Sequence, residues 1–178
     1  MTLFARAILG RQQEPRFAAR RVERVEVAWD EASKRRLRRT SDAGTDVAVD
    51  LPRGTYLADG AVLYDDGERI IVASRRPERA LIVRFDASAS PEQLLEQALR
   101  LGHAFGNQHV PVDIEGDEAH VPLTTSEAVA RATVDALQLS AVRIAVAPVA
   151  LGRERPLSVG HAHEHASHHD RDSEASSR

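Results

Sequence analysis

Histidine is the residue type through which this chain could do chemistry, and five of its eight histidines lie near the carboxyl end. They form the string HAHEHASHH and are His161, His163, His165, His168 and His169. Imidazole binds nickel, copper and zinc, and a short histidine-rich tract is a metal-binding composition. Alternation places the first three rings on one side of an extended chain, and Glu164 and Asp170 could add oxygen ligands. Because alanine, glutamate and serine interrupt the histidines, we read the tract as a metal site and not as a purification tag.

His109 stands apart from this tract, between an expected helix and an expected strand. The helix starts at Ser90-Pro91, and the pair Gly106-Asn107 is expected to end it, since both residue types tolerate a left-handed backbone. His109 then lies at the start of an alternating strand, held by two regular elements without lying inside either. Spacing alone leaves two interpretations open: a metal ligand or acid/base group, and a structural residue that caps the helix or completes the loop.

A third candidate, His120, follows from hairpin geometry. If Gly116 and Asp117 form a two-residue turn, Asp113 faces His120 across the two strands. Both side chains then point to a sheet face that no helix covers. A carboxylate bonded to an imidazole can orient a metal ligand, although such a pair is more often an ordinary surface contact. His103, in the last turn of the helix, is expected to be structural.

Residues 79–152 show the order β-α-β-β-α-β, which is the ferredoxin-like arrangement. Ser90 and Ser126 cap the two helices, and the first helix carries an apolar face. That face comprises Leu94, Leu95, Ala98, Leu99 and Gly102. Two helices would cover one sheet face and leave the other open, so we expect a homodimer.

Residues 1–78 are expected to form a small antiparallel β domain, because short apolar strands alternate with turn residues about every ten positions. The basic stretch from Lys34 to Thr40 reads as an exposed edge strand. Residues 153–178, the histidine-rich tail, lose apolar periodicity after Gly160 and are expected to be disordered without metal. The fold class is therefore α+β, with two domains and a tail.

Composition excludes several functions. The chain has no cysteine, so thiolate metal sites and cysteine nucleophiles are excluded. A net charge of −3 and the lack of aromatic residues on the candidate sheet strands 110–115 and 142–149 argue against nucleic acid. The arginine clusters 16–24 and 34–39 are read as solvated or protein-binding. No stretch is long enough to span a membrane, and we expect a cytoplasmic protein.

Several strings, in order, carry a resemblance to a known family. These are RRLRRTSDAGTDVAVDLPRGTYLADGAVLYDDGERIIVASRRPERALIVRF, then LGHAFGNQHVPVDI, then EAHVPL, then the histidine-rich tail. The combination resembles the UreE-type urease accessory proteins, which are nickel metallochaperones, over nearly the whole chain. The resemblance implies that His109 is the metal-binding histidine of the family motif and that two copies meet through residues 79–152. It also implies two partners, the urease apoprotein and the urease accessory GTPase complex.

This sequence departs from the family at two places. Gln108 stands where arginine is common, and residues 122–126 lack the histidines that some members carry there. We expect a protein that binds and delivers nickel, that could also bind zinc or copper, and that catalyses no reaction. The alternative is a general histidine-rich store or buffer for divalent metals. A hydrolase using His109 with Asp113 or Glu115 has no nucleophile motif to support it.

Overall fold

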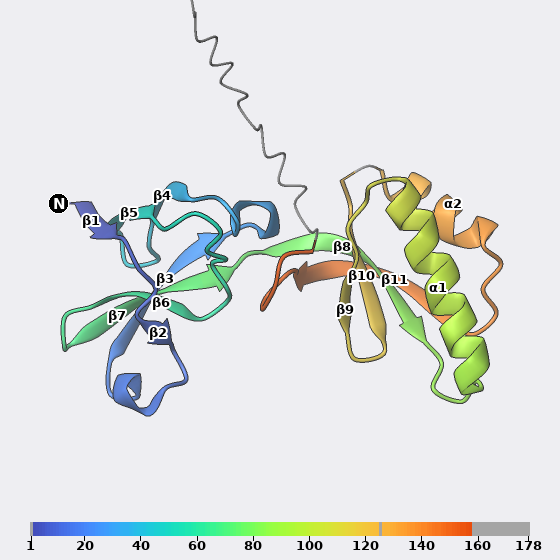
Figure 1. The fold of residues 1–178 in the computed structure, drawn as a ribbon, viewed down its shortest axis with the longest axis horizontal. Coiled ribbons are helices and arrows are strands. Elements are labelled where there is room, and N and C mark those ends of the chain that lie inside the picture. Colours follow the sequence, from blue (N-terminus) through green and yellow to red (C-terminus); the bar gives the residue numbers. More distant parts are fainter. Residues whose placement is uncertain (1, 125, 158–178) are drawn as a thin grey trace, which may run out of the picture.

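The computed structural model describes residues 2–124 and 126–157, which form two lobes of a mixed α+β protein (Figure 1). The expected α+β class is confirmed. Strand β8 (Pro77–Phe85) leaves the N-terminal lobe and becomes a central strand of the C-terminal sheet. None of the helices in these described ranges is long and apolar enough to cross a membrane.

The N-terminal lobe contains two sheets. The first has the order β1-β5-β4 and the second the order β2-β6-β7-β3. Their strands are β1 (Thr2–Ala5), β2 (Gly10–Arg11), β3 (Arg21–Val27), β4 (Arg36–Thr40), β5 (Asp46–Asp50), β6 (Ala61–Asp65) and β7 (Arg69–Arg75). The expectation of a purely antiparallel domain is wrong, because β1 pairs with β5, and β3 with β7, in parallel. A parallel pair needs a long connection, and each of these pairs is separated by some forty residues of other structure.

Alternation along the strands builds the core of this lobe. The inward residues of β3 and β5 pack together with residues of β6 and β7, and they are Val25, Val27, Val47, Val49, Leu63, Ile71 and Ala73. Strand β4 pairs only with β5 and lies at the sheet edge, as its basic sequence predicts. Leu37, the one sizeable apolar residue of that strand, packs against this core.

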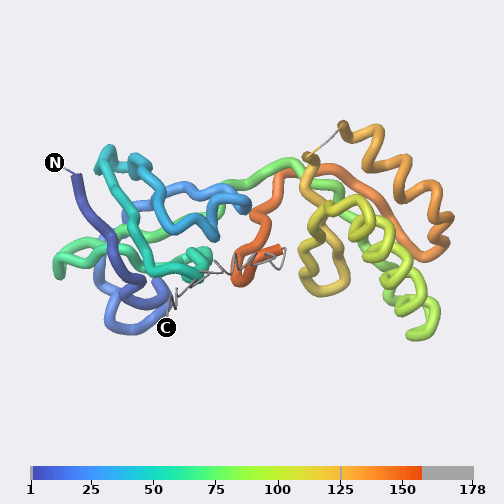
Figure 2. The backbone as a smooth tube through the Cα atoms, turned by 45° about the horizontal axis from the view of Figure 1, so that its top comes forward, coloured from blue at the N-terminus to red at the C-terminus, as the bar shows by residue number. Residues whose placement is uncertain are grey.

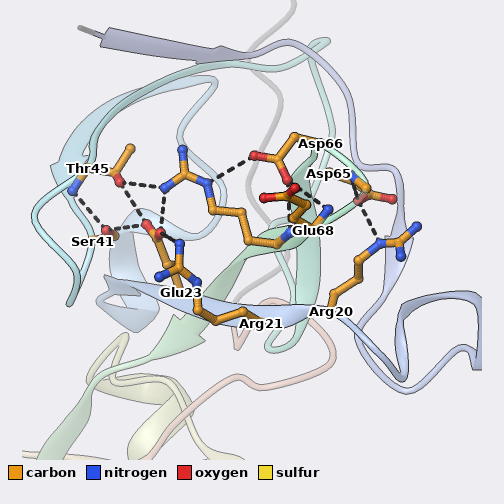
Figure 3. A network of polar contacts seen from close by, with 10 residues as sticks. Arg20, Arg21, Glu23, Ser41, Thr45, Asp65, Asp66 and Glu68 are labelled. Carbon is orange, nitrogen blue, oxygen red and sulfur yellow. Dashed lines mark hydrogen bonds and ion pairs between the residues drawn. The ribbon is translucent and has the colours of Figure 1, made fainter.

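A buried carboxylate joins the two sheets of the N-terminal lobe (Figure 3). Glu23 of β3 is only 2% exposed. It accepts hydrogen bonds from Ser41 Oγ at 3.0 Å and Thr45 Oγ1 at 2.7 Å, beside the turn between β4 and β5. It also pairs with Arg69 of β7. Burial raises the pKa of Glu23, but the hydrogen bonds from Thr45, Arg69 and Ser41 outweigh burial and leave the pKa below its usual value.

The C-terminal lobe follows the predicted β-α-β-β-α-β order. Its further elements are α1 (Pro91–Asn107), β9 (Asp113–Glu115), β10 (Glu118–Pro122), α2 (Glu127–Ala136) and β11 (Val142–Ala150). The strands lie in the order β11-β8-β10-β9 and are all antiparallel. Both helices pack on one face of this sheet through Leu101, Phe105, Ala130 and Val134. The predicted caps are confirmed: Ser90 Oγ accepts from Gln93 N, and Ser126 Oγ from Val129 N.

After β11 the chain turns back between the lobes, as Figure 2 shows. Leu151 is fully buried, and the next three residues contact the N-terminal lobe. Arg153 exchanges two hydrogen bonds with Asp59, and Glu154 pairs with Arg11 at 2.8 Å. Arg153 and Glu154, which the sequence assigns to the tail, therefore contact the N-terminal lobe, although their side chains are exposed.

Candidate metal centre

His109 lies at the carboxyl end of α1, but the helix ends differently from the prediction. Gly106 and Asn107 are both helical, so the expectation that they break the helix is wrong. The left-handed residue is His109 itself, with φ 54°. Gly106 is not forced out of the helix, because glycine permits a left-handed backbone without requiring it.

Two hydrogen bonds define this helix end. His109 N donates to Gly106 O at 3.0 Å, and Val110 N donates to Phe105 O, also at 3.0 Å. This pattern is the Schellman motif, and His109 occupies the position that glycine usually takes. A side chain there costs about 1–2 kcal/mol relative to a right-handed backbone. Since the side chain is exposed, it gains little packing in return. The arrangement therefore fixes the backbone from which the exposed imidazole extends.

An exposed apolar stripe runs along α1 toward His109. Leu95 and Leu99 are 62% and 64% exposed, and they lie one turn apart on the same face as Gly102 and Gly106. The predicted apolar face is therefore not the buried one: the buried residues of α1 are Gln97, Leu101 and Phe105.

Beside the stripe lies an apolar groove of about 420 Å³ between α1 and the β9–β10 hairpin. Its lining includes Leu94, Leu95, Ala98, Leu101, Val112 and Ile114. Ile114 is 64% exposed, although it lies on a strand. Contiguous exposed apolar surface of this kind is a candidate interaction site.

The hairpin has the predicted register but not the predicted side-chain pair. Asp113 lies opposite His120, and Glu115 opposite Glu118. His120 is only 4% exposed, and its Nε2 hydrogen-bonds Glu118 Oε2 at 2.7 Å. Asp113 Oδ2 instead accepts from the backbone N of Gly152 at 2.7 Å. The expected Asp113–His120 contact is wrong because each side chain has another partner within reach.

The hydrogen bond from His120 and that from Arg84 lower the pKa of Glu118, so its carboxylate stays charged beside the ring. His120 Nδ1 has no hydrogen-bond partner in the described part of the chain. His103 shares a hydrogen bond with Asn107, at 3.0 Å between Nε2 and Nδ2, which fits the expected structural role.

The described residues do not complete a metal site by themselves. Within residues 2–124 and 126–157, no group of three or more histidine, aspartate or glutamate side chains is gathered closely enough to hold an ion. His109 is exposed and belongs to no such group of three within those residues. The predicted tail ligands His161, His163, His165, His168 and His169 lie outside the described residues.

The basic clusters of the N-terminal lobe are largely paired with carboxylates. Arg35 and Arg36 both contact Asp50, and Arg39 contacts Glu31. Hydrogen bonds from Arg38 and Thr2 hold the pKa of Asp46 far below its usual range. Each of these arginines therefore has a carboxylate partner within the lobe.

Comparison with known proteins adds an independent line of evidence. Residues 5–74 match the family model of the UreE urease accessory protein, N-terminal domain, which spans most of the N-terminal lobe. The urease accessory protein UreE of Burkholderia orbicola (strain AU 1054) is 43% identical over 94 residues, or 53% of this chain and 43% of that protein. The UreE of Yersinia kristensenii is 39% identical over 101 residues, or 54% of this chain and 44% of that protein.

Each match covers less than half the length of these relatives. The proteins are named as accessory to the enzyme urease and not as the enzyme. The resemblance read from the sequence is confirmed for the matched part of the chain: residues 5–74 are similar to the N-terminal domain of UreE urease accessory proteins, and about half of the chain is similar to proteins of that name.

Proposed function

We propose that this protein binds nickel at His109 and delivers it to apo-urease during urease maturation, without catalysing a reaction. The observation that carries the proposal is the backbone of His109. An imidazole occupies a left-handed helix end that costs less with glycine, and it is exposed and not packed. A ligand held at a fixed, accessible point accounts for that cost, and the accessory-protein relatives supply the context.

One imidazole does not hold nickel tightly, so the site needs a second copy of the chain. We propose that two protomers meet through the α1 stripe of Leu95 and Leu99, with Ile114 beside it. In a twofold interface the same patch faces itself. Because the stripe runs toward the end of α1, this packing brings the two His109 rings close to the axis. The ferredoxin-like lobe of residues 79–152 is then the dimerisation unit.

The tail supplies the remaining ligands in this proposal. Its histidines gather ions and complete the shell around the pair of His109 rings. Imidazole ligands can be protonated or out-competed, so the site can be emptied as well as filled. Zinc and copper suit the same ligands, and selection of nickel then depends on geometry and supply.

The proposed partners are those that the resemblance to urease accessory proteins implies. We propose that the protein acts in the cytoplasm with the urease apoprotein and the urease accessory GTPase complex, and that the N-terminal lobe contacts them. The ion-paired arginines of β4 lie on an exposed sheet edge, which suits recognition of another protein better than binding of nucleic acid.

Nickel titration by calorimetry tests the proposal on four forms. They are the full chain, a chain ending at Gly160, and that shorter chain carrying either His109→Asn or His103→Ala. Asparagine tolerates a left-handed backbone, so the first substitution removes the ring with little change at the helix end. His103→Ala removes an exposed imidazole from the same helix and is the matched control.

We expect the shorter chain to bind one ion per dimer, His109→Asn to abolish this binding, and His103→Ala to keep it. If all binding disappears with the tail, His109 is structural. The protein is then better described as a histidine-rich buffer of divalent metals.

A further inference from the structure

The segment that follows β11 touches both lobes at a single glycine. Gly152 N donates a hydrogen bond to Asp113 Oδ2 of β9 at 2.7 Å. The carbonyl of the same residue accepts a hydrogen bond from the Tyr56 hydroxyl of the N-terminal lobe. One peptide segment therefore bridges a side chain of each lobe.

Neighbouring contacts hold this bridge in place. Arg153 Nε donates to Asp59 Oδ2 at 3.0 Å, and Asp59 N donates to Arg153 O at 2.7 Å. On the other side of the tyrosine, the guanidinium of Arg75 lies 5.7 Å from the centre of the Tyr56 ring. Arg75 is buried and donates to the carbonyl of Leu57 at 2.7 Å, so the ring rests on a fixed cation.

Position 152 requires glycine for two separate reasons. Its φ is +58°, a left-handed conformation that disfavours other residues. A Cβ there would also lie 2.8 Å from the Tyr56 hydroxyl oxygen and 3.3 Å from Arg155 O. The first distance is too short for a carbon atom, so any side chain would push Tyr56 away and open the bridge.

Asp113 connects this bridge to the candidate metal centre. It is the first residue of β9 and lies only four residues after His109. The loop between them is thus held at one end by the Schellman bonds of α1 and at the other by the bond from Gly152.

We propose that Tyr56, Gly152 and Asp113 form an interdomain clamp that couples the two lobes and positions the loop carrying His109. The coupling stands on the contacts alone, and the positioning part rests on the proposed function of His109. The charges that act on Tyr56 agree with the close approach of residues from both lobes. Burial raises the pKa of Tyr56, Arg75 opposes it, and the charges of Asp113 and Glu154 raise it further. The phenol therefore remains a donor at neutral pH.

The lobes carry separate spectroscopic probes that can test the coupling. Trp29, the only tryptophan, lies in the N-terminal lobe. Both α-helices of the described residues lie in the C-terminal lobe, so ellipticity at the helical band reports mainly on that lobe. Urea unfolding of the full chain, followed by both signals, shows whether the lobes unfold as one unit.

Gly152→Ala is the test variant and Gly116→Ala its matched control. Gly116 has nearly the same backbone, with φ +62°, but nothing lies within 4 Å of an added Cβ. We expect coincident transitions in the wild type and in Gly116→Ala, and separated transitions in Gly152→Ala. Coincident transitions in all three proteins, or separated ones in the wild type, would overturn the coupling.

Tyr56→Phe keeps the test decisive should Gly152→Ala fail to fold. It removes only the hydroxyl that reaches Gly152, and we expect a smaller separation of the two transitions. It also removes the closest clash, so adding it to Gly152→Ala should cost less than the two single changes summed. Additive costs would mean that Tyr56 and Gly152 do not act together.

Nickel affinity tests the positioning part. We expect Gly152→Ala to weaken nickel binding at His109 by about tenfold relative to Gly116→Ala, as loss of an orienting contact does at other metal sites. Equal affinities in these two variants overturn the positioning of His109. Absence of nickel binding in the wild type overturns the proposed function instead, and the unfolding comparison still decides the coupling.

Discussion

At His109, the backbone conformation that exposes the imidazole lowers the stability of the folded protein. A left-handed φ at a helix end favours glycine, which has no Cβ to clash with the following carbonyl. Histidine takes that conformation more readily than β-branched residues do, but still at a cost. The protein accepts this cost at the position that presents its exposed imidazole, which makes the conflict testable.

His109→Gly should unfold at a higher free energy than His109→Ala, by about 1 kcal/mol, because alanine retains the clash and glycine does not. Both variants should lose the nickel site equally. Urea unfolding gives the first comparison and calorimetry the second. A glycine variant less stable than the alanine variant would mean that the left-handed conformation is absent in solution.

Glu23 makes a second residue-scale prediction through its buried network. Its folded pKa lies below the ordinary value of 4.5, so the unfolded chain binds the proton more readily. The network's stabilisation is therefore complete above the unfolded pKa and is lost as the pH falls through the folded pKa. Glu23→Gln should lower the unfolding free energy at pH 7 by about 2 kcal/mol and weaken the acid dependence of stability.

Urea unfolding between pH 7 and pH 3 measures both effects. Glu26→Gln is the control, since Glu26 lies on the same strand with an exposed side chain. It should change neither quantity much. An acid dependence that Glu23→Gln leaves intact would assign that dependence to the exposed ion pairs.

At the scale of elements, helix α1 carries apolar residues on two different faces. Leu101 and Phe105 pack on the sheet, whereas Leu95 and Leu99 remain at the surface. Packing on the sheet uses only the face that carries Leu101 and Phe105. The exposed face that carries Leu95 and Leu99 is therefore available to contact another copy of the chain.

Leu99→Glu should weaken the proposed dimer at least about tenfold, because the interface would then bury an unpaired charge. Protomer stability should change little, since the side chain is exposed in the protomer. The matched control is Val129→Glu on α2, where an equally apolar and 52% exposed residue lies on the other helix. Sedimentation analysis over a range of concentrations measures both. Equal dimerisation of the two variants would move the interface away from α1.

Short-range patterns in the sequence predict the helix caps and the hairpin correctly. They do not predict which strands pair when those strands lie far apart in the sequence. The caps at Ser90 and Ser126 and the register of the β9–β10 hairpin are confirmed, because each depends on a few neighbouring residues. The parallel pairing of β1 with β5 depends on chain folding across forty residues, which local patterns do not encode.

The sequence does not show which apolar face of α1 is buried, for a related reason. Leu95 and Leu99 are as hydrophobic as Leu101, and only their surroundings distinguish a core face from an interaction face. In the same way, Gly152 is an ordinary turn residue in the sequence. Its importance arises from Tyr56, almost a hundred positions earlier. The sequence identifies His109 as a candidate but does not predict its left-handed backbone, which Gln138 at the end of α2 shares.

At the scale of the whole molecule, the two lobes divide their surfaces by chemistry. The N-terminal lobe presents charged residues that are largely paired with each other. The C-terminal lobe presents the apolar stripe and groove beside the fixed imidazole. Association through the C-terminal lobe would therefore leave the charged lobe of each protomer free for other proteins.

Such a dimer links metal binding to assembly. If one ion is shared by two His109 rings, it binds the dimer and not the monomer, so nickel must tighten the dimer by the same factor by which dimerisation tightens nickel. In the chain ending at Gly160, nickel should lower the dimer dissociation constant at least about tenfold, in keeping with typical coupling energies. Removing nickel with a chelator should restore the original value.

Sedimentation of serial dilutions, with and without nickel, measures this linkage without any contribution from the tail histidines. His103→Ala should respond like the parent chain, whereas His109→Asn should dimerise to the same extent whether nickel is present or not. A dissociation constant that nickel leaves unchanged in the parent chain would mean that each His109 binds its ion within one protomer. The α1 stripe would then serve an interface unrelated to the metal.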